Sequence, residues 1–470
     1  MPRYEFSEGT SNKFWEINLT GKAFTTTFGK IGSKGQTKLK EFRTPAAAKT
    51  AYEALIAEKV KKGYVAAGAR NGKAASAKPA APARPDVRNP ALEAAIVANP
   101  DDRDAWAIYG DWLQEQGDPR GEVIALELGG KAKQAKKLFD QHPEHFLGPL
   151  AEHQTVRDEG ANNGSSQLRT PAQEKEWQKT HRQAFLWRYG FIRRLRLSHD
   201  YYSVEWDGKV VDALDLVLRH PSARFIVEFA FHSNADPNEN NLQSVIDLLG
   251  KKAPATTRKI TFGDNVDQIS WHHTGNLGKL WKGVPNLTTL EIETGEFDVG
   301  KMIAPALQRA IFLTGGLSKS CGKNIATAQM PAIEHLEIYY GDDNYGGDCT
   351  IKEVRPLLAR TDLPKLRYLG LKNAQFQNDI ASAVVAAPIV KQLATLDLSL
   401  GAMTDEGARA LNEGKAALKH LACLDLRGNY LTADGVKLVK GLAKQVLAGD
   451  QRQPYRRASG ELRYFVSVSE

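Results

Sequence analysis

The segment Leu418–Val439 constrains the fold of this chain more than any other. Its residues follow the spacing L-x-x-L-x-L-x-x-N-x-L. A step of two residues puts Leu424 and Leu426 on the same side of a short strand, where they point into a core. We expect Asn429 to pair backbone groups where the chain leaves the strand, and Thr432 suits a helix start. Such a unit cannot bury its own apolar side, so it needs similar units on both sides.

The same spacing recurs through the second half of the chain. Leu393–Leu398 repeats the pattern of Leu421–Leu426 at a distance of 28 residues. Other copies, first strong and then weak, occupy 366–371, 333–338, 287–292, 260–262, 225–229 and 192–197. The interval from Leu290 to Leu336 is longer, so it holds an insertion or a degenerate copy. The pattern of Leu462–Val468 predicts a last, capping strand.

This pattern resembles the leucine-rich repeat. A period of 28 residues leaves room for a helix in each copy, as in proteins of the ribonuclease-inhibitor type. The resemblance implies an α/β fold in which residues 191–470 form a leucine-rich-repeat solenoid, a ribonuclease-inhibitor-like horseshoe with a C-terminal cap. We expect the concave strand face of this solenoid to bind a protein partner.

Charge is distributed unevenly along the chain. Lys and Arg outnumber Asp and Glu by 17 to 7 in residues 1–89, whereas the net charge of the whole chain is +8. The basic excess therefore lies entirely in this first segment. Such an excess predicts either a polyanionic partner for the segment or a basic surface that only keeps the protein soluble.

Residues 1–66 predict a small β-sheet with one helix packed on it. Strands are expected at 14–19, 23–30 and 36–42, and a helix from Pro45 to Glu58. Trp15 is expected in the core. The buried face of the helix is expected to contain Ala47, Ala51, Leu55 and Val60.

The order Trp15, Phe28-Gly29-Lys30-Ile31-Gly32, Gly35-Gln36, Lys59 and Lys62-Gly63-Tyr64 resembles the WGR domain. This module occurs in poly(ADP-ribose) polymerases, where it binds DNA near strand breaks, and in many bacterial proteins. The resemblance implies that Phe28 offers an apolar face to nucleic acid and that Lys30, where the family has arginine, attracts phosphate.

We therefore predict a nucleic-acid interface, with DNA as the partner, on this small sheet. It comprises the motif and the basic or polar residues after it: Phe28, Gly29, Lys30, Lys34, Gln36, Lys38, Lys40 and Arg43. The other interpretation is that Phe28 belongs to the core, the glycines only form turns and the lysines are solvated.

Two further segments separate this module from the repeats. Residues 67–89 are rich in Ala, Pro and Lys and predict a flexible linker. Residues 90–190 predict helices, and the part from Leu92 to Glu122 resembles a short bacterial repeat-companion domain that often precedes leucine-rich repeats. We expect 90–190 to be this helical region together with a cap over the open edge of the first repeat.

The loop from Tyr339 to Asp348 is rich in Tyr, Asp and Gly. Three interpretations fit this composition: a solvated loop, a recognition patch on the rim of the solenoid, or a weak Ca²⁺ or Mg²⁺ site without EF-hand spacing. The recognition patch is predicted to contain partner-binding residues from both ends of the loop: Tyr339, Tyr340, Asp342, Asp343 and Tyr345.

No stretch predicts catalysis, a cofactor or a metal. Gly315–Asn324 has glycines and a lysine, but their spacing does not fit a phosphate-binding loop. The three cysteines are scattered, which argues against a disulfide framework or a cysteine-based zinc site. Neither a long apolar run nor the apolar core of a signal peptide is present, so we expect a cytoplasmic protein without a membrane partner.

Together these features predict a non-enzymatic adaptor. Its WGR-like domain at 1–66 would engage DNA, and its repeats would engage an unidentified protein. The alternative is a scaffold for proteins alone, in which the WGR-like domain docks an acidic partner protein.

Overall fold

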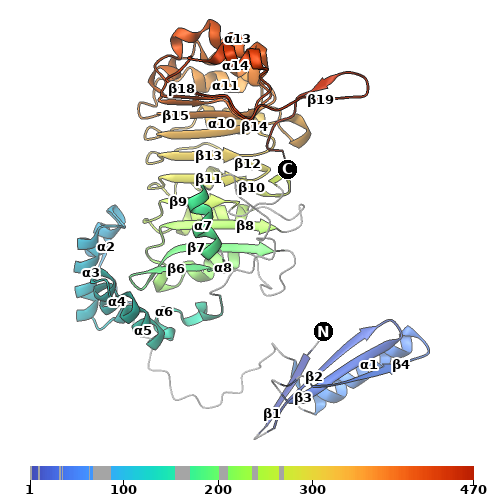
Figure 1. The fold of residues 1–470 in the computed structure, drawn as a ribbon. Coiled ribbons are helices and arrows are strands. Elements are labelled where there is room, and N and C mark those ends of the chain that lie inside the picture. Colours follow the sequence, from blue (N-terminus) through green and yellow to red (C-terminus); the bar gives the residue numbers. More distant parts are fainter. Residues whose placement is uncertain are drawn as a thin grey trace. The chain divides into compact units, whose positions relative to one another are not determined.

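The computed structural model describes residues 3–8, 11–30, 33, 35–62, 64–66, 86–153, 170–180, 182–200, 210–234, 242–263 and 269–469. The chain divides into two compact units, Met1–Arg84 and Pro85–Glu470 (Figure 1). None of the helices in the described residues is long and apolar enough to span a lipid bilayer.

The first unit is a five-stranded antiparallel sheet with one helix packed on it. Along the sheet the strands lie in the order β4-β3-β2-β1-β5. The elements are β1 (Arg3–Glu8), β2 (Ser11–Thr20), β3 (Ala23–Lys30), β4 (Gln36–Glu41), α1 (Pro45–Lys61) and β5 (Val65–Ala66). The predicted strands fall in β2, β3 and β4, whereas β1 and β5 have no counterpart in the prediction.

The core of this unit lies between the sheet and α1. Alternation along β2 and β3 turns Trp15, Ile17 and Phe24 to this side, and all three are buried. The prediction for Trp15 is therefore confirmed. The prediction for Ala47 is wrong, because Ala47 is exposed and Ala48 is fully buried in its place. A step of one residue rotates a side chain by about 100° around a helix, which is enough to exchange the two faces.

The predicted linker at 67–89 extends too far. Residues 67–85 lie outside the described residues. Residues 86–89 belong to the second unit, because Arg224 forms a 2.5 Å ion pair with Asp86 and donates a hydrogen bond to the Val87 carbonyl oxygen at 3.2 Å. Arg88 likewise pairs with Glu93 at 2.5 Å. The contacts of the second unit thus start at Asp86.

The second unit begins with a helical segment. Its helices are α2 (Pro90–Ala98), α3 (Arg103–Glu115), α4 (Pro119–Leu128), α5 (Ala132–Gln141) and α6 (Pro143–Phe146). Asn89 and Asp102 cap α2 and α3 by accepting hydrogen bonds from backbone N–H groups. Trp106 of α3 packs against Phe191, the first residue of a strand of the large sheet, and against Phe225, which precedes the next parallel strand of that sheet. The helices and the first strands therefore share one apolar cluster.

An eleven-stranded sheet forms the body of the second unit. After an antiparallel edge strand, every neighbouring pair is parallel, and neighbours in the sheet follow one another along the chain. The strands are β6 (Phe185–Arg188), β7 (Phe191–Asp200), β8 (Glu228–Asn234), β9 (Lys259–Phe262), β11 (Thr289–Glu293), β13 (Arg309–Leu313), β14 (His335–Gly341), β15 (Tyr368–Ala374), β16 (Thr395–Asp397), β17 (Cys423–Asp425) and β18 (Gln445–Leu447).

Helices and short strands complete this unit. The helices are α7 (Pro171–Thr180), α8 (Val210–Leu218), α9 (Gln243–Lys252), α10 (Lys319–Ala326), α11 (Ile351–Leu358), α12 (Gln377–Val384), α13 (Asp405–Glu413) and α14 (Ala433–Val439). Two small sheets join β10 (His273–Asn276) to β12 (Glu296–Asp298) and β19 (Tyr455–Arg456) to β20 (Leu462–Arg463).

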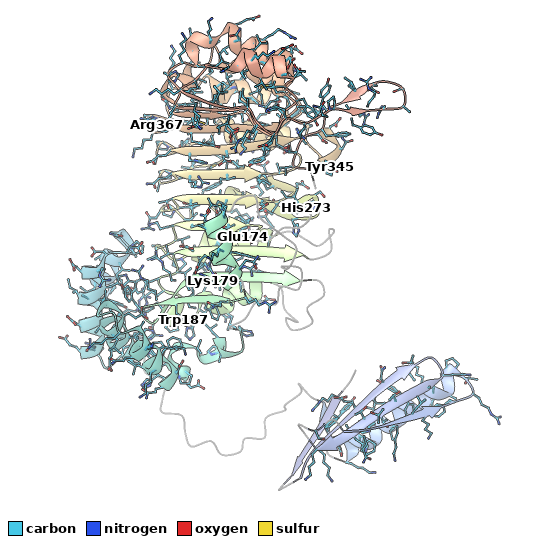
Figure 2. The ribbon with its side chains drawn as sticks, in the orientation of Figure 1. Glu174, Lys179, Trp187, His273, Tyr345 and Arg367 are labelled. Atoms are coloured by element: carbon cyan, nitrogen blue, oxygen red, sulfur yellow. The ribbon has the colours of Figure 1, made fainter. Side chains whose placement is uncertain are left out.

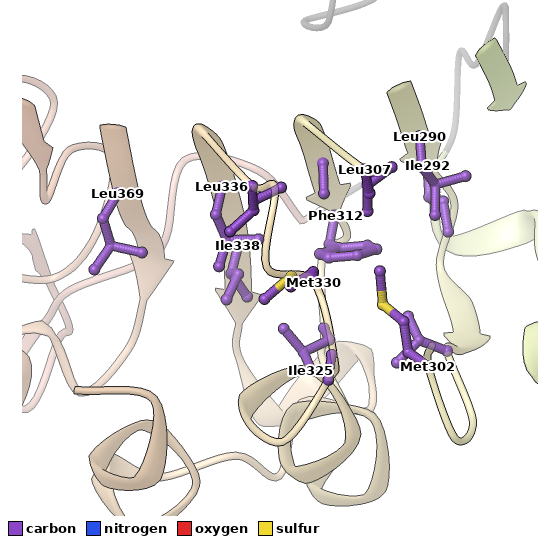
Figure 3. Close-up of a cluster of buried hydrophobic side chains, with 14 of the residues drawn as sticks. Leu290, Ile292, Met302, Leu307, Phe312, Ile325, Met330, Leu336, Ile338 and Leu369 are labelled. Carbon is purple, nitrogen blue, oxygen red and sulfur yellow. The ribbon is translucent and has the colours of Figure 1, made fainter. Parts of the chain in front are cut away.

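The register of the large sheet places the repeated leucines in rows. Leu336, Leu369, Leu396 and Leu424 are consecutive partners across β14 to β17, and all are fully buried. Burying one leucine contributes roughly 1.5–3 kcal/mol. Ile325 of α10 belongs to the same core cluster and lies on its helix side, near Met330 (Figure 3). The rows make one continuous core between strands and helices.

The long interval between two clear repeats contains a degenerate copy. β13 pairs with β11 and β14, and Ala310 partners Leu290 on one side and Leu336 on the other. Leu307 and Phe312 keep the apolar spacing and are fully buried (Figure 3). Alanine at the central position is what hides this copy in the sequence.

The predicted capping strand at 462–468 is wrong. The last strand of the large sheet is β18, and β20 pairs only with β19. The alternating Val466 and Val468 are nevertheless buried. Asn373, near the end of β15, forms hydrogen bonds with the backbone of Ser467 and Val468. The apolar alternation therefore reflects packing across the ends of other strands rather than strand pairing.

Asn429 has the role that the sequence predicts. Its side-chain amide donates to the carbonyl oxygens of Leu398 and Leu426 at 2.9 and 3.0 Å, and its side-chain oxygen accepts from the Met403 N–H at 3.1 Å. The side chain is fully buried. It thus joins two consecutive repeats where both leave the sheet.

We predict that Asn429→Ala lowers the free energy of unfolding by roughly 2–4 kcal/mol, because it leaves buried backbone groups unpaired. Urea unfolding followed by far-UV circular dichroism measures the change. The exposed Lys437→Ala serves as the control and should shift the midpoint little. Equal midpoints for the two variants would contradict the role of Asn429.

Candidate functional site

The side chains of the large sheet that alternate with the buried leucines are mostly charged. We call this surface the polar sheet face. Its charged residues lie on or directly after β9 to β17: Lys259, Glu291, Arg309, His335, Glu337, Lys372, Asp397, Asp425 and Arg427. Opposite charges occupy neighbouring strands, so cross-strand pairing is built into the register.

Ion pairs run across the strands of the polar sheet face. The Lys372 ammonium lies 3.2 Å from Glu337 on one side and 3.1 Å from Asp397 on the other. The Tyr368 hydroxyl donates to Asp397 at 2.6 Å, and its ring stacks on His335. A hollow of about 360 Å³ opens beside these groups. It is large enough for a side chain or a small polar group, and its lining carries both signs of charge.

Glu337 is the most strongly perturbed carboxyl group of this face. Burial alone would raise its pKa, but the hydrogen bond with His335 and the charge of Lys372 lower the pKa to about 2. Burial would also lower the pKa of Lys372, yet the nearby charges of Asp397 and Glu337 raise it. The pair therefore stays ionised across the physiological range.

The helix α7 covers one end of the polar sheet face. Trp177 is buried, the guanidinium of Arg196 lies 5.5 Å from its ring, and Arg194 donates to the Thr180 hydroxyl at 3.2 Å. Figures 1 and 2 show α7, marked by Glu174 and Lys179, in front of the first strands of the sheet. The open part of the face therefore lies over the later strands, β13 to β17.

The first two residues of the predicted recognition patch, Tyr339 and Tyr340, are buried. Tyr339 and Tyr340 are 4% and 3% exposed. Tyr340 continues the inward alternation of Leu336 and Ile338 and packs edge-on against Phe376. Tyr339 points to the polar sheet face and is covered by the segment that contains Val468. Extension of β14 through Gly341 places both tyrosines in the strand rather than in an exposed loop. Tyr339 lines the hollow of the polar sheet face, and its contact with a partner stays a prediction.

The remaining residues of the predicted patch differ in how exposed they are. Asp342 is buried and its carboxylate accepts from the Asn344 backbone and side chain. Asp343 is exposed and Tyr345 is half-buried. Asp348 accepts instead from the Lys319 N–H at 2.6 Å. In the described part of the chain no three His, Cys, Asp or Glu side chains form a potential metal site, this loop included.

The register of the first unit gathers lysines on the side of the sheet that α1 covers. Trp15 faces Phe28, which faces Gln36, so the three side chains share one surface. Lys38 and Lys40 lie on the same surface, and both are exposed. Their ammonium groups lie 5.6 and 5.4 Å from the rings of Phe28 and Phe42. The aromatic rings thus support the lysines without neutralising them.

Lys13 and Lys30 are direct cross-strand partners on this surface. Like charges in this position are destabilising. Lys59 of α1 adds a third ammonium group, 5.5 Å from the Trp15 ring. Together with Lys38 and Lys40 these residues form what we call the lysine cluster, and within the described residues none of the five has a carboxylate partner. The cluster is therefore an anion-attracting surface.

Residues 3–71 match the sequence model of the WGR domain. The first unit of this chain thus carries a WGR domain. Two Escherichia coli K12 proteins are similar to this segment. Protein YehF is 43% identical over 65 residues, or 14% of this chain and 24% of that protein, and YfeS is 39% identical over 62 residues, or 13% and 25%. This chain therefore spans only about a quarter of the length of these curated relatives.

A crystal structure of a protein from Bacteroides fragilis is similar over nearly the whole chain. It covers 96% of this chain and 97% of its own length, with a TM-score of 0.50 and 21% sequence identity. The likeness concerns the fold, a mixed α/β architecture with a small antiparallel sheet and a large, mostly parallel one.

The predicted interface residues of the WGR domain differ in burial and in the face of the sheet on which they lie. Phe28 is half-buried in the core cluster. Gly29 lies on the opposite face of the sheet, where an added Cβ would come within 2.8 Å of Ser33 and 2.9 Å of Gly35. Arg43 is exposed just before α1, and Lys34 lies outside the described residues. Gly29 is therefore required by the close packing of the turn.

Lys13 and Lys59 are not among the residues predicted for the interface. The signal for Lys13 is present in the alternation of β2, because it lies two residues before Trp15. The signal for Lys59 is its place in the WGR resemblance, but only the packing of α1 shows that it lies over Trp15.

The perturbed pKa of Glu337 predicts a pH dependence of stability. A carboxyl group with a lowered pKa stabilises the fold above its ordinary value of 4.5, and this contribution is lost as the pH falls toward about 2. We expect Glu337→Gln to cost roughly 3 kcal/mol at neutral pH and roughly half of that at pH 3. Urea unfolding at the two pH values measures both differences.

The exposed Glu334→Gln is the matched control, and its cost should be near zero at both pH values. A cost for Glu337→Gln that does not change between neutral and acid pH would show that its charge does not contribute.

Proposed function

We propose that this chain is a non-enzymatic adaptor. Its WGR domain binds nucleic acid, with DNA as the first candidate, and its second unit holds a protein partner on the polar sheet face. The observation that carries the first part is the lysine cluster, in which Lys13 and Lys30 lie opposite one another and have no carboxylate partner among the described residues. A phosphate backbone supplies the negative charge that this arrangement lacks.

We propose further that the second unit is a leucine-rich-repeat solenoid of the ribonuclease-inhibitor type, with the polar sheet face as its concave surface. The order of the parallel strands and the 28-residue spacing support this assignment. The polar sheet face offers both signs of charge around a hollow of about 360 Å³. A partner with an alternating pattern of charges and a projecting side chain fits such a surface.

An acidic protein is the alternative partner of the WGR domain. The same lysine cluster would attract a run of carboxylates, and the chain would then be a scaffold for proteins alone. The aromatic rings beside the lysines favour nucleic acid over an acidic protein. Rings under the lysines, such as Phe28 and Phe42, can also contact sugar or base, which an acidic peptide does not provide.

We expect Lys13→Glu/Lys30→Glu in the full chain to weaken binding to a labelled DNA duplex by more than tenfold, because it reverses two cations that contact phosphate. Fluorescence anisotropy at several salt concentrations measures this. The slope of log affinity against log salt should fall by about two for the loss of two phosphate contacts.

Lys282→Glu/Lys365→Glu is the charge-matched control, since both lysines are exposed in the second unit. Its affinity for DNA should stay within about twofold of the unchanged chain. If both double variants bind DNA equally, nucleic-acid binding by the WGR domain is wrong. Binding of polyglutamate that only Lys13→Glu/Lys30→Glu abolishes, without any binding of DNA, would favour the acidic protein.

A further inference from the structure

A two-stranded arm extends from the last part of the second unit. It runs from Tyr455 to Phe465, and β19 and β20 form its only sheet. Gly460 lies at the turn with a φ of +88°, which suits glycine, and Arg457 and Glu461 bond across it. Figure 1 shows β19 projecting away from the large sheet. We call this segment the β19–β20 arm.

The arm is fixed to the second unit just before it starts. The Arg452 guanidinium donates to the carbonyl oxygens of Gly428 and Gly401 at 2.8 and 2.7 Å, and it lies 4.5 Å from the Tyr430 ring. Gln451 donates to the Leu426 carbonyl oxygen at 2.9 Å. These contacts join the entrance of the arm to the last repeats.

The exit of the arm is fixed as well. The Tyr430 hydroxyl donates to the Phe465 carbonyl oxygen and accepts from the Phe465 N–H, both at 3.0 Å. Beyond it, the fully buried Asn373 accepts from the N–H groups of Ser467 and Val468 at 2.9 Å. Buried polar side chains thus hold both ends, and the segment between them is presented in a defined place.

The arm exposes apolar side chains to an unusual degree. Seven large apolar side chains are exposed in the described residues, and three of them lie on the arm: Tyr455 at 60%, Leu462 at 38% and Phe465 at 43%. The rings of Tyr455 and Phe465 lie 6.4 Å apart. In the register of the arm Tyr455 faces Arg463, so these two residues and Phe465 share one face of the ribbon, whereas Leu462 faces Arg456 on the other face. The neighbouring rings of Tyr455 and Phe465 mark a binding surface more clearly than single exposed residues do.

The arm is also basic. Arg456, Arg457 and Arg463 lie among these side chains, against one carboxylate, Glu461. Arg457 is paired with Glu461 at 3.0 Å. Arg456 contacts only the Gly460 carbonyl oxygen, at 3.4 Å, and Arg463 has no carboxylate partner among the described residues. Two exposed guanidinium groups are therefore available to an anionic partner.

We propose that the β19–β20 arm is a second nucleic-acid contact, located in the second unit. Phosphates would bind Arg463 beside the rings and Arg456 on the other face of the ribbon, and bases or sugars would pack on Tyr455 and Phe465. Aromatic rings next to arginines are the combination that binds single strands without sequence preference, and a two-stranded ribbon also fits the major groove of a duplex.

Other occupants fit less well. A specific protein interface takes about 20–30 residues on each side, whereas the arm from Tyr455 to Phe465 has eleven. A second copy of the arm would bring like charges together. The proposal does not rest on the function proposed for the WGR domain, because the contact involves different residues in the other unit.

The test uses the full chain with its lysine cluster already reversed by Lys13→Glu/Lys30→Glu. A fluorescein-labelled oligothymidylate and a labelled duplex, each about 20 nucleotides long, serve as probes at low salt. We expect this variant to keep measurable affinity for at least one of the two probes. Adding Arg456→Glu/Arg463→Glu should reduce that remaining affinity more than tenfold and lower its salt slope by about one to two.

Adding Tyr455→Ala/Phe465→Ala in place of the arginine changes should weaken binding with little change in the salt slope, because stacking is not ionic. The matched control adds Lys365→Glu/Lys391→Glu, two exposed lysines elsewhere in the second unit, and should leave the affinity unchanged. Thermal unfolding verifies that each variant is folded, which is expected because the changed side chains are exposed.

The outcomes separate the two proposals. If the chain with the reversed lysine cluster and an intact arm binds neither probe, the arm proposal is overturned and that for the WGR domain stands. If the arm variants bind as well as the control, the arm proposal is likewise overturned. Arm-dependent binding of polyglutamate but of neither oligonucleotide would identify an acidic protein as the occupant and would also overturn it.

Discussion

Parallel pairing of each strand with the next one along the chain is the constraint on which the second unit depends. It places Leu336, Leu369, Leu396 and Leu424 in one row, so that every repeat buries the apolar side of its neighbour. Since no repeat can do this alone, the stability of each one comes from the contacts on both sides. Asn429 adds hydrogen bonds to the same arrangement where the chain leaves the sheet.

The same register decides the electrostatics of the opposite side. Residues between the leucines must also form rows, and the chain fills them with opposite charges, so that Lys372 lies between Glu337 and Asp397. Paired charges of this kind stabilise the sheet and leave a surface of mixed sign. In the WGR domain, by contrast, Lys13 and Lys30 are partners of the same sign. A surface of mixed sign and a surface of a single sign attract different classes of charge.

Local patterns predicted much of the architecture but only part of the candidate sites. The alternation around Trp15 placed it in the core, and the leucine spacing located most strands of the large sheet. The copy with Ala310 was hidden because alanine carries little apolar signal. Tyr339 was assigned to a surface because the segment that covers it, around Val468, lies more than a hundred residues away.

The sequence by itself determined the periodic features: the repeating strands, the helix starts and the concentration of basic residues near the N-terminus. These features depend on neighbours a few residues apart, and such spacing is readable in one dimension. Only the tertiary structure decided which side chains meet across strands. The lysine cluster, the ion pairs of the polar sheet face and the fixed ends of the β19–β20 arm all depend on pairing register and on contacts between distant segments.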